Sequence, residues 1–166
     1  MINFERLSQD NFQQFGYVGR SGDGITKNIR DGSVLLSKSP AALTHDEHAL
    51  DLALEFYDVQ CASDPMQISV AERHEHSSQM FVPMSGQHYL VIVWDDHPSE
   101  AARVRAFVGA PDDVVIYKPG IWHHGIISLD RQGLFASTMW RTRGGRDVEF
   151  LQIPQPFALP LQELPK

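Results

Sequence analysis

The sequence predicts an all-β fold, a β-sandwich or β-barrel preceded by one short helix. Most of the chain after Gly32 divides into short segments in which apolar residues alternate with polar ones or run together. Turn-forming residues separate these segments at close spacing. The turns are Pro98-Ser99, 109–112, Pro119-Gly120, 130–133 and Gly144-Gly145. Many short strands joined in this way are typical of sandwiches and barrels.

The helix is expected between residues 8 and 16. Ser8 can accept a hydrogen bond from an unpaired amide of the first turn, and Gly16 can adopt the left-handed conformation that ends a helix. The strands expected after it are 33–36, 54–59, 66–73, 80–82, 88–94, 103–108, 114–118, 124–128, 134–139 and 147–153. Within 66–73, Met66, Ile68 and Val70 fall on one face.

Two segments do not fit the strand pattern. Residues 45–55 alternate poorly and are expected to contain a helical turn. The C-terminal tail holds four prolines, which favour an extended strap over regular structure. We find no repeat or linker, so residues 1–166 are expected to form a single domain.

Composition restricts the possible functions. The net charge of −7 disfavours binding to nucleic acid, and no apolar run is long enough to cross a bilayer. The lone cysteine, Cys61, cannot form an internal disulfide and is interpreted as a buried thiol. A cytoplasmic enzyme without a membrane or nucleic-acid partner is therefore expected.

The first chemically suggestive cluster is Glu72, His74 and His76. Their spacing of two places all three side chains on one face of a strand. Imidazole nitrogens and a carboxylate that converge on one point suit a divalent cation. The alternative is an exposed strand end with no ligand.

The second cluster is His123 and His124, directly after a Pro-Gly turn and Trp122. Adjacent strand residues face opposite ways, so at most one of these histidines can point into a barrel. Taken alone, a histidine bonded to a backbone carbonyl is the more ordinary interpretation. Together with the first cluster, a shared site is expected.

A third cluster holds Arg141, Arg143 and Arg146 around the Gly144-Gly145 bend. Arginine binds carboxylates in a bidentate manner, so these residues are candidates for a substrate carboxylate, with Arg146 interpreted as solvent-exposed. A phosphate-binding loop and a Gly-x-Ser-x-Gly nucleophile motif are both missing from the sequence.

These residues resemble the two motifs of the cupin superfamily. Gly120-Ile121-Trp122-His123 matches the second motif. Counting back from Gly86 in the first motif places Gln79 where cupins usually have Glu, and Glu72 and His74 at the two histidine positions. The resemblance implies a cupin-type β-barrel, that is, a double-stranded β-helix or jelly roll.

Within the cupins, the chain resembles the ureidoglycolate lyase family of allantoin degradation. The blocks that carry this resemblance are Leu7-Ser8-Gln9, Glu72-Arg73-His74 with Gln79, 81–84, 104–107, Trp122-His123-His124 and Arg143-Gly144-Gly145. The departures from the family pattern are Arg30-Asp31 in the early turn, 58–60, Lys118 and Gly125. They bear on the substrate more than on the fold.

The resemblance implies a carbon–nitrogen lyase that splits ureidoglycolate into glyoxylate and urea. Its site would use His123 or Glu72 as the base, and His74 or His124 to deliver the proton. Arg143, with Lys118 and Gln79, would bind the substrate carboxylate. A divalent metal ion, if one is used, would be held by Glu72, His74, Gln79 and His123.

The resemblance also implies a homodimer, for which Trp94, Trp140 and Phe157 are candidate interface aromatics. Two alternatives remain open from the sequence. One is another cupin enzyme, an isomerase, lyase or metal-dependent oxygenase, acting on a small hydroxy or oxo acid. The other is a cupin that binds a small ligand without catalysis.

Overall fold

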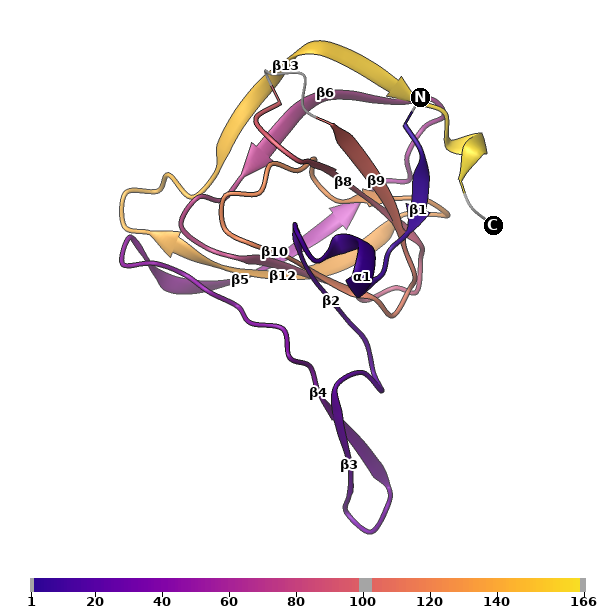
Figure 1. The fold of residues 1–166 in the computed structure, drawn as a ribbon, viewed down its shortest axis with the longest axis vertical. Helices are drawn as coiled ribbons and strands as arrows, with labels where there is room; N and C mark the ends of the chain where they lie inside the picture. The colour runs from indigo at the N-terminus through magenta and orange to yellow at the C-terminus, as the bar shows by residue number, and fades with distance from the viewer. Residues whose placement is uncertain (1, 99–102, 165–166) are drawn as a thin grey trace.

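The computed structural model describes residues 2–98 and 103–164 and consists almost entirely of strands (Figure 1). The lower layer in the figure is a five-stranded sheet, and the layer above it has four strands. The five-stranded sheet has the order β2 (Gly16–Gly19), β10 (Val114–Tyr117), β7 (Gln79–Pro83), β12 (Gly133–Thr142) and β5 (Ala49–Val59). The four-stranded sheet has the order β1 (Phe4–Arg6), β9 (Val104–Gly109), β8 (Tyr89–Trp94) and β11 (Ile127–Ser128).

The remaining strands form two antiparallel pairs. The pair β6 (Met66–Arg73) and β13 (Glu149–Leu159) makes a third layer at the top of Figure 1. The pair β3 (Ile25–Ile29) and β4 (Val34–Lys38) is a hairpin that projects from the body. The strands thus pair in four separate sheets, and the described residues do not form one closed barrel.

Two hydrophobic cores separate the three layers. In the first core, Phe135 of the five-stranded sheet packs against Phe81 of the same sheet and against Tyr89 of the four-stranded sheet. In the second core, Leu90 lies in one buried cluster with Ile68 of β6. Strand β8 is therefore buried on both faces, which explains its uninterrupted apolar sequence.

The prediction of a nearly all-β chain with one short N-terminal helix is confirmed. Helix α1 spans Gln9–Phe12, and Ser8 caps it in a reciprocal pair of hydrogen bonds with Asn11. The prediction that Gly16 ends the helix is wrong, because the helix ends at Phe12 with Gln13 as its C-cap, and Gly16 begins β2. A Cβ at Gly16 would lie 1.8 Å from the carbonyl oxygen of Ile116, so this position admits no side chain.

The helical turn expected in residues 45–55 is also wrong, because β5 begins at Ala49. Its outward residues, starting at Leu50 and Leu52, are apolar, so both faces of the strand carry apolar residues and the alternation is hidden. The tail is more regular than expected, since β13 continues to Leu159. A register shift between Gln152 and Phe157 leaves the prolines outside the ladder, and a short 3-10 helix (Leu161–Glu163) follows.

Two further features concern the surface. The lone thiol of Cys61 is exposed, contrary to expectation, and its Sγ donates to the carbonyl of Leu129 at 2.9 Å. None of the helices among residues 2–98 and 103–164 has the length and apolar character needed to cross a bilayer.

Candidate active site

Backbone pairing brings the two motifs of the sequence together. Glu72 near the end of β6 and His123 after the Pro-Gly turn form an antiparallel bridge, with N–O distances of 2.7 and 2.8 Å. His74 follows two residues after Glu72. One ligand atom from each of Glu72, His74 and His123 lies within 4.8 Å of the others. Among the described residues, this is the one cluster of such side chains that could hold a metal ion.

The imidazole of His74 is fixed with one nitrogen free. Its Nδ1 lies 2.8 Å from the carbonyl oxygen of Asp147 and donates to it. Its Nε2 is buried and has no hydrogen-bond partner. Burial, together with the charge of nearby His123, lowers the pKa of His74, so the ring is neutral and carries a lone pair on Nε2.

His123 has a different environment. It is 1% exposed and stacks on Tyr117 with ring centroids 4.1 Å apart. Its Nδ1 donates to the carbonyl of Ile121 at 2.9 Å, while its Nε2 lies 3.2 Å from Oε1 of Gln79 and 3.5 Å from Oε1 of Glu72. A nitrogen between two oxygen acceptors is stabilised by a proton or a cation at that point.

Glu72 is the carboxylate of the cluster. Burial raises its pKa, but the hydrogen bond with His123 and the charges of the surrounding histidines outweigh burial, so the pKa lies below its usual value. The side chain is therefore ionised at neutral pH. An ionised carboxylate beside a buried imidazole gives the cluster the mixed oxygen and nitrogen donors that divalent ions prefer.

Glu72 and His74 open onto a cavity of about 680 Å³ between β5, β12 and β13. Arg143 also lines this cavity, and its guanidinium makes no hydrogen bond or ion pair with any described residue. Neighbouring Arg141 is instead paired with Glu55, which also accepts a hydrogen bond from the Tyr57 hydroxyl at 2.9 Å. One cationic group of the cavity wall is thus available to a ligand and the other is occupied.

The structure brings together most of the residues that the sequence singled out. Glu72, His74, Gln79 and His123 form one cluster, and Arg143 lies on the wall of the same cavity. Two residues lie apart from the cavity lining. The Nδ1 of His124 donates to the carbonyl of Gly125 at 2.7 Å, and Nζ of Lys118 donates to the carbonyl of Gln13 at 2.5 Å.

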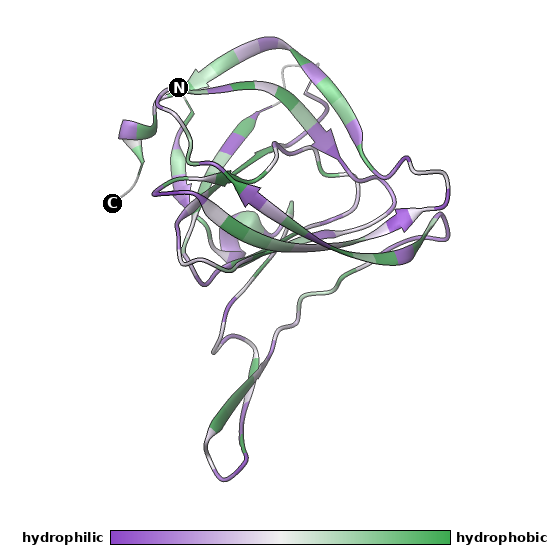
Figure 2. Ribbon diagram, turned by 180° about the vertical axis from the view of Figure 1, so that it is seen from behind, coloured by the Kyte–Doolittle hydropathy of each residue, from purple (hydrophilic) through white to green (hydrophobic). Residues whose placement is uncertain are grey.

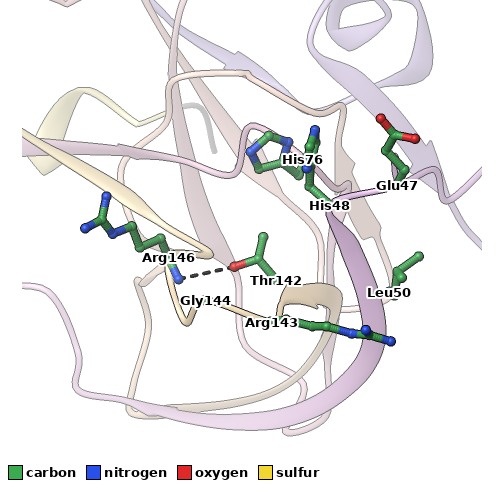
Figure 3. A pocket seen from close by; sticks show the side chains of 8 residues that line it. All are labelled: Glu47, His48, Leu50, His76, Thr142, Arg143, Gly144 and Arg146. Carbon is green, nitrogen blue, oxygen red and sulfur yellow. Dashed lines mark hydrogen bonds between the residues drawn. The ribbon is translucent and has the colours of Figure 1, made fainter.

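A second cavity, of about 670 Å³, adjoins the first and shares Thr142 and Arg143 with it (Figure 3). His76 and His48 face this second cavity, and Nδ1 of His76 lies 2.8 Å from Oδ2 of Asp46. The expected alignment of His76 with Glu72 and His74 is not observed, because β6 ends at Arg73 and the alternation stops there. Arg146 is exposed, as expected, and lines the same cavity.

Sequence reasoning missed the contribution of β5 to the site. Glu55 and Tyr57 face the cavity from this strand, and Asp147 holds His74 in place. The available signal was the even spacing of Asp51, Glu55 and Tyr57, which are four and two residues apart and so fall on one face of a strand. The apolar residues between them concealed it, since an apolar row is ordinarily taken as the buried face.

The family model described as ureidoglycolate lyase matches residues 1–160. The chain belongs to the ureidoglycolate lyase family. Relatives named ureidoglycolate lyase include one from Brucella melitensis biotype 2, 30% identical over 138 residues, and one from Pseudomonas syringae pv. tomato, 29% identical over 136 residues. Each alignment covers 81% of this chain and 79% of the relative.

This member of the ureidoglycolate lyase family has a cupin-like fold. A crystal structure of a dTDP sugar isomerase from Desulfovibrio desulfuricans G20 matches with a TM-score of 0.50, covering 82% of this chain and 85% of that one. The two sequences are 14% identical, so the likeness concerns the fold alone. The predicted family and the predicted cupin-type fold are both confirmed, with the difference that the strands of the described part of the chain do not close into one barrel.

Proposed function

We propose that this protein cleaves ureidoglycolate into glyoxylate and urea, as a carbon–nitrogen lyase of allantoin degradation. One observation carries the proposal beyond family membership. Neutral His74, with an unpartnered Nε2, lines the same cavity as the unpaired guanidinium of Arg143. Ureidoglycolate is a hydroxy acid whose leaving group is an amide nitrogen. Its cleavage requires a base for the hydroxyl proton and a cation for the carboxylate, and both groups lie on one cavity wall here.

The proton transfer can be assigned to His74. Its Nε2 removes the proton from the carbinol hydroxyl of ureidoglycolate, the oxygen forms the carbonyl of glyoxylate, and the bond from carbon to the urea nitrogen breaks with its electron pair on nitrogen. The same imidazole returns the proton to that nitrogen, which completes urea. The hydroxyl oxygen and the leaving nitrogen are bonded to one carbon, so a single base can reach both.

Arg143 binds the carboxylate of the substrate. Its planar guanidinium can form two parallel hydrogen bonds to a carboxylate. The pairing of Arg141 with Glu55 leaves Arg143 as the unpaired guanidinium among the described residues that line the cavity. Lys118 is bonded to a backbone carbonyl outside the lining and has no role here.

Glu72, His123 and Gln79 surround His74 with donor atoms that favour a positive charge. The donor set fits a divalent metal ion, because Nε2 of His74 is a buried orphan and the two oxygens around Nε2 of His123 favour positive charge there. Glu72, His74 and His123 would hold such an ion, with Oε1 of Gln79 beside it. Because the ion would take the lone pair on Nε2 of His74, the proton transfer assigned to this nitrogen applies to the metal-free site. When bound, the ion would supply Lewis-acid polarisation of a substrate oxygen.

The proposed cellular location is the cytoplasm. A single exposed cysteine, which has no disulfide partner, is compatible with a reducing compartment.

The deciding experiment is a direct assay of glyoxylate release from ureidoglycolate by the purified protein, with and without a chelator and added divalent ions. Turnover well above the spontaneous rate, reduced at least about 100-fold in His74→Gln, is expected. The absence of turnover under every metal condition would overturn the substrate assignment, and full activity of His74→Gln would overturn the assignment of the base.

A further inference from the structure

One polar group of the active-site cavity has no role in the proposed proton transfer, namely the ion pair between Arg141 and Glu55. Both residues line the cavity onto which Glu72 and His74 open. Nη2 of Arg141 donates to Oε1 of Glu55, while Oε2 accepts a hydrogen bond from the Tyr57 hydroxyl at 2.9 Å. We call Glu55, Tyr57 and Arg141 the β5–β12 triad.

Strand pairing fixes the β5–β12 triad in place. In the antiparallel register of β5 with β12, Glu55 lies opposite Ser137 and Tyr57 lies opposite Phe135. The Tyr57 ring packs against the first core, edge-on to Phe81 with ring centroids 5.2 Å apart. Figure 2 shows hydrophilic segments on β5 and at the end of β12, the two strands that carry the triad. Side chains on paired strands are held more precisely than side chains on loops.

The protonation state of each member follows from its neighbours. The hydrogen bond from Arg141 lowers the pKa of Glu55 more than burial raises it, so Glu55 is ionised. Burial and the neighbouring carboxylates of Glu55 and Glu72 raise the pKa of Tyr57, so its hydroxyl keeps its proton and donates it to Glu55. The charges of Arg141 and Glu55 cancel, and the triad presents no net charge to a ligand.

Glu55 and Arg141 keep hydrogen-bonding capacity that no other described residue uses. A carboxylate has about four lone-pair positions, and Glu55 accepts one bond from Arg141 and one from Tyr57. A guanidinium carries several N–H donors, and the Arg141 side chain, which is 49% exposed, donates to Glu55 alone among the described residues. An unused acceptor and unused donors therefore lie side by side on the cavity wall.

A primary amide has the complementary arrangement. Its carbonyl oxygen accepts hydrogen bonds and its NH2 group donates them, and the two lie at the same end of one planar group. A carboxylate does not suit this position, because Glu55 would repel it, and an ammonium group would be repelled by Arg141. Arg143, which has no acidic partner, suits the carboxylate instead. The two arginines of the cavity wall thus fit different parts of one ligand.

We propose that Glu55 and Arg141 bind the terminal amide of the substrate's ureido group, with Glu55 accepting from its NH2 group and Arg141 donating to its carbonyl oxygen. Tyr57 is a positioning residue that holds Glu55. The inference rests on the proposed function and deepens it, because it makes the site selective for N-carbamoyl compounds over other amides. A site built to bind an N–H group rejects the analogue that lacks it, since its own polar groups would stay unpaired.

The contact with Arg141 also assists departure of the leaving group. When the bond from carbon to the urea nitrogen breaks, the electron pair left on that nitrogen is shared with the ureido carbonyl oxygen. A guanidinium that donates to this oxygen stabilises the developing negative charge until His74 returns the proton to nitrogen. Arg141 therefore contributes to kcat as well as to binding, whereas Glu55 contributes to the choice of substrate.

The first test compares two ligands that cannot react, because they lack the hydroxyl group of the substrate. N-Carbamoylglycine carries the carboxylate and the terminal amide, and N-acetylglycine has a methyl group in place of the NH2 group. In isothermal titration calorimetry, the wild type is expected to bind N-carbamoylglycine at least about tenfold more tightly than N-acetylglycine. Equal dissociation constants, or no binding of N-carbamoylglycine, would overturn the proposal.

The second test assigns this preference to the β5–β12 triad. Glu55→Ala is expected to reduce it to less than about threefold, and Arg141→Ala to weaken both ligands about tenfold, because both carry the carbonyl oxygen. Asp58→Asn is the matched control, since Asp58 is an exposed acid of β5 outside the cavity lining, and it should keep the wild-type preference. A wild-type preference in Glu55→Ala, or unchanged affinities in Arg141→Ala, would overturn the assignment.

The same measurements separate this inference from the proposed function. If the wild type releases glyoxylate from ureidoglycolate but binds the two ligands equally, the lyase activity stands and the amide site is wrong. If it prefers N-carbamoylglycine and shows no turnover of ureidoglycolate, the amide site stands and the reaction is wrong.

Discussion

The carbonyl oxygen of Asp147 accepts a hydrogen bond from Nδ1 of His74 at 2.8 Å, and this contact joins the proposed base to the loop that carries Arg143. The side chain of Asp147 closes the loop by accepting a hydrogen bond from the backbone amide of Thr142. One residue therefore orients the imidazole with its backbone and the loop with its carboxylate. The substrate-binding and proton-transfer groups depend on the same anchor.

Replacement of this anchor is expected to impair both functions. In Asp147→Ala the loop loses its bond to the amide of Thr142, and the carbonyl that orients His74 becomes less fixed. Because outer residues of this kind typically contribute about 10- to 100-fold to activity, a fall of that size in kcat/KM is expected. Asp147→Asn keeps an acceptor oxygen and should retain most of the activity. Equal activity of the Ala variant and wild type would contradict the role.

His74→Gln tests the proposed base. It is expected to reduce kcat about 100- to 10,000-fold, the usual contribution of a positioned proton-transfer group. His76→Gln, a histidine on the neighbouring cavity, is the control and should remain close to wild type. Since burial lowers the pKa of His74 below 6.5, the neutral base persists as pH falls through that value. The acid limb of the profile of kcat against pH should therefore lie below 6.5, and a midpoint at or above 7 would contradict the assignment.

The buried histidines also predict how stability depends on pH. Burial lowers the pKa of both His74 and His124, so between the folded and unfolded pKa values the unfolded chain binds more protons. The free energy of unfolding must then fall as pH decreases below about 6.5. Urea denaturation between pH 7.5 and 5.5 should show a decreasing midpoint. His124→Gln should reduce the slope, and a slope identical to wild type would mean that His124 is not buried in its neutral form.

A metal ion at the cluster is testable without turnover. Zn²⁺ added to chelator-treated protein should raise the melting temperature, since a ligand at 100 times its dissociation constant stabilises the folded state by about 2.7 kcal/mol. Glu72→Gln removes the ionised donor and should abolish most of this shift. His124→Gln leaves the three donor residues in place and should retain it. An equal shift in all three proteins would place the metal elsewhere.

The sequence was informative where one face of a strand was buried and the other polar. Strand β6 was predicted from Met66 to Arg73 and is found there, because Ile68 is buried and Gln67 exposed. Strand β5 was not recognised in full, because its outward residues are apolar although they are exposed. The resemblance to cupin motifs grouped Glu72, His74, Gln79 and His123, whereas periodicity alone would have added His76.

Long-range contacts set the limit of prediction at the site. The backbone bridge between Glu72 and His123 spans about fifty residues, and only the two family motifs indicated it. The contact of His74 with Asp147 involves a backbone carbonyl, so the identity of residue 147 carries no signal for it. The bond between Lys118 and the carbonyl of Gln13 is equally invisible in the sequence.

Arg143 and Lys118 give the clearest contrast between the cations predicted to bind substrate. Arg143→Gln should raise KM for ureidoglycolate about 10- to 100-fold, the usual effect of removing a hydrogen bond to a charged group, while kcat changes less. Arg143→Lys keeps the charge but loses the bidentate geometry. Its KM should therefore lie between that of the wild type and that of Arg143→Gln. Lys118→Gln should change KM less than about threefold, because its ammonium group is already bonded to Gln13 outside the cavity lining. Steady-state kinetics of the three variants test this contrast: a larger effect on KM of the Lys118 substitution than of the Arg143 substitutions would move the carboxylate site from the cavity to the surroundings of Lys118.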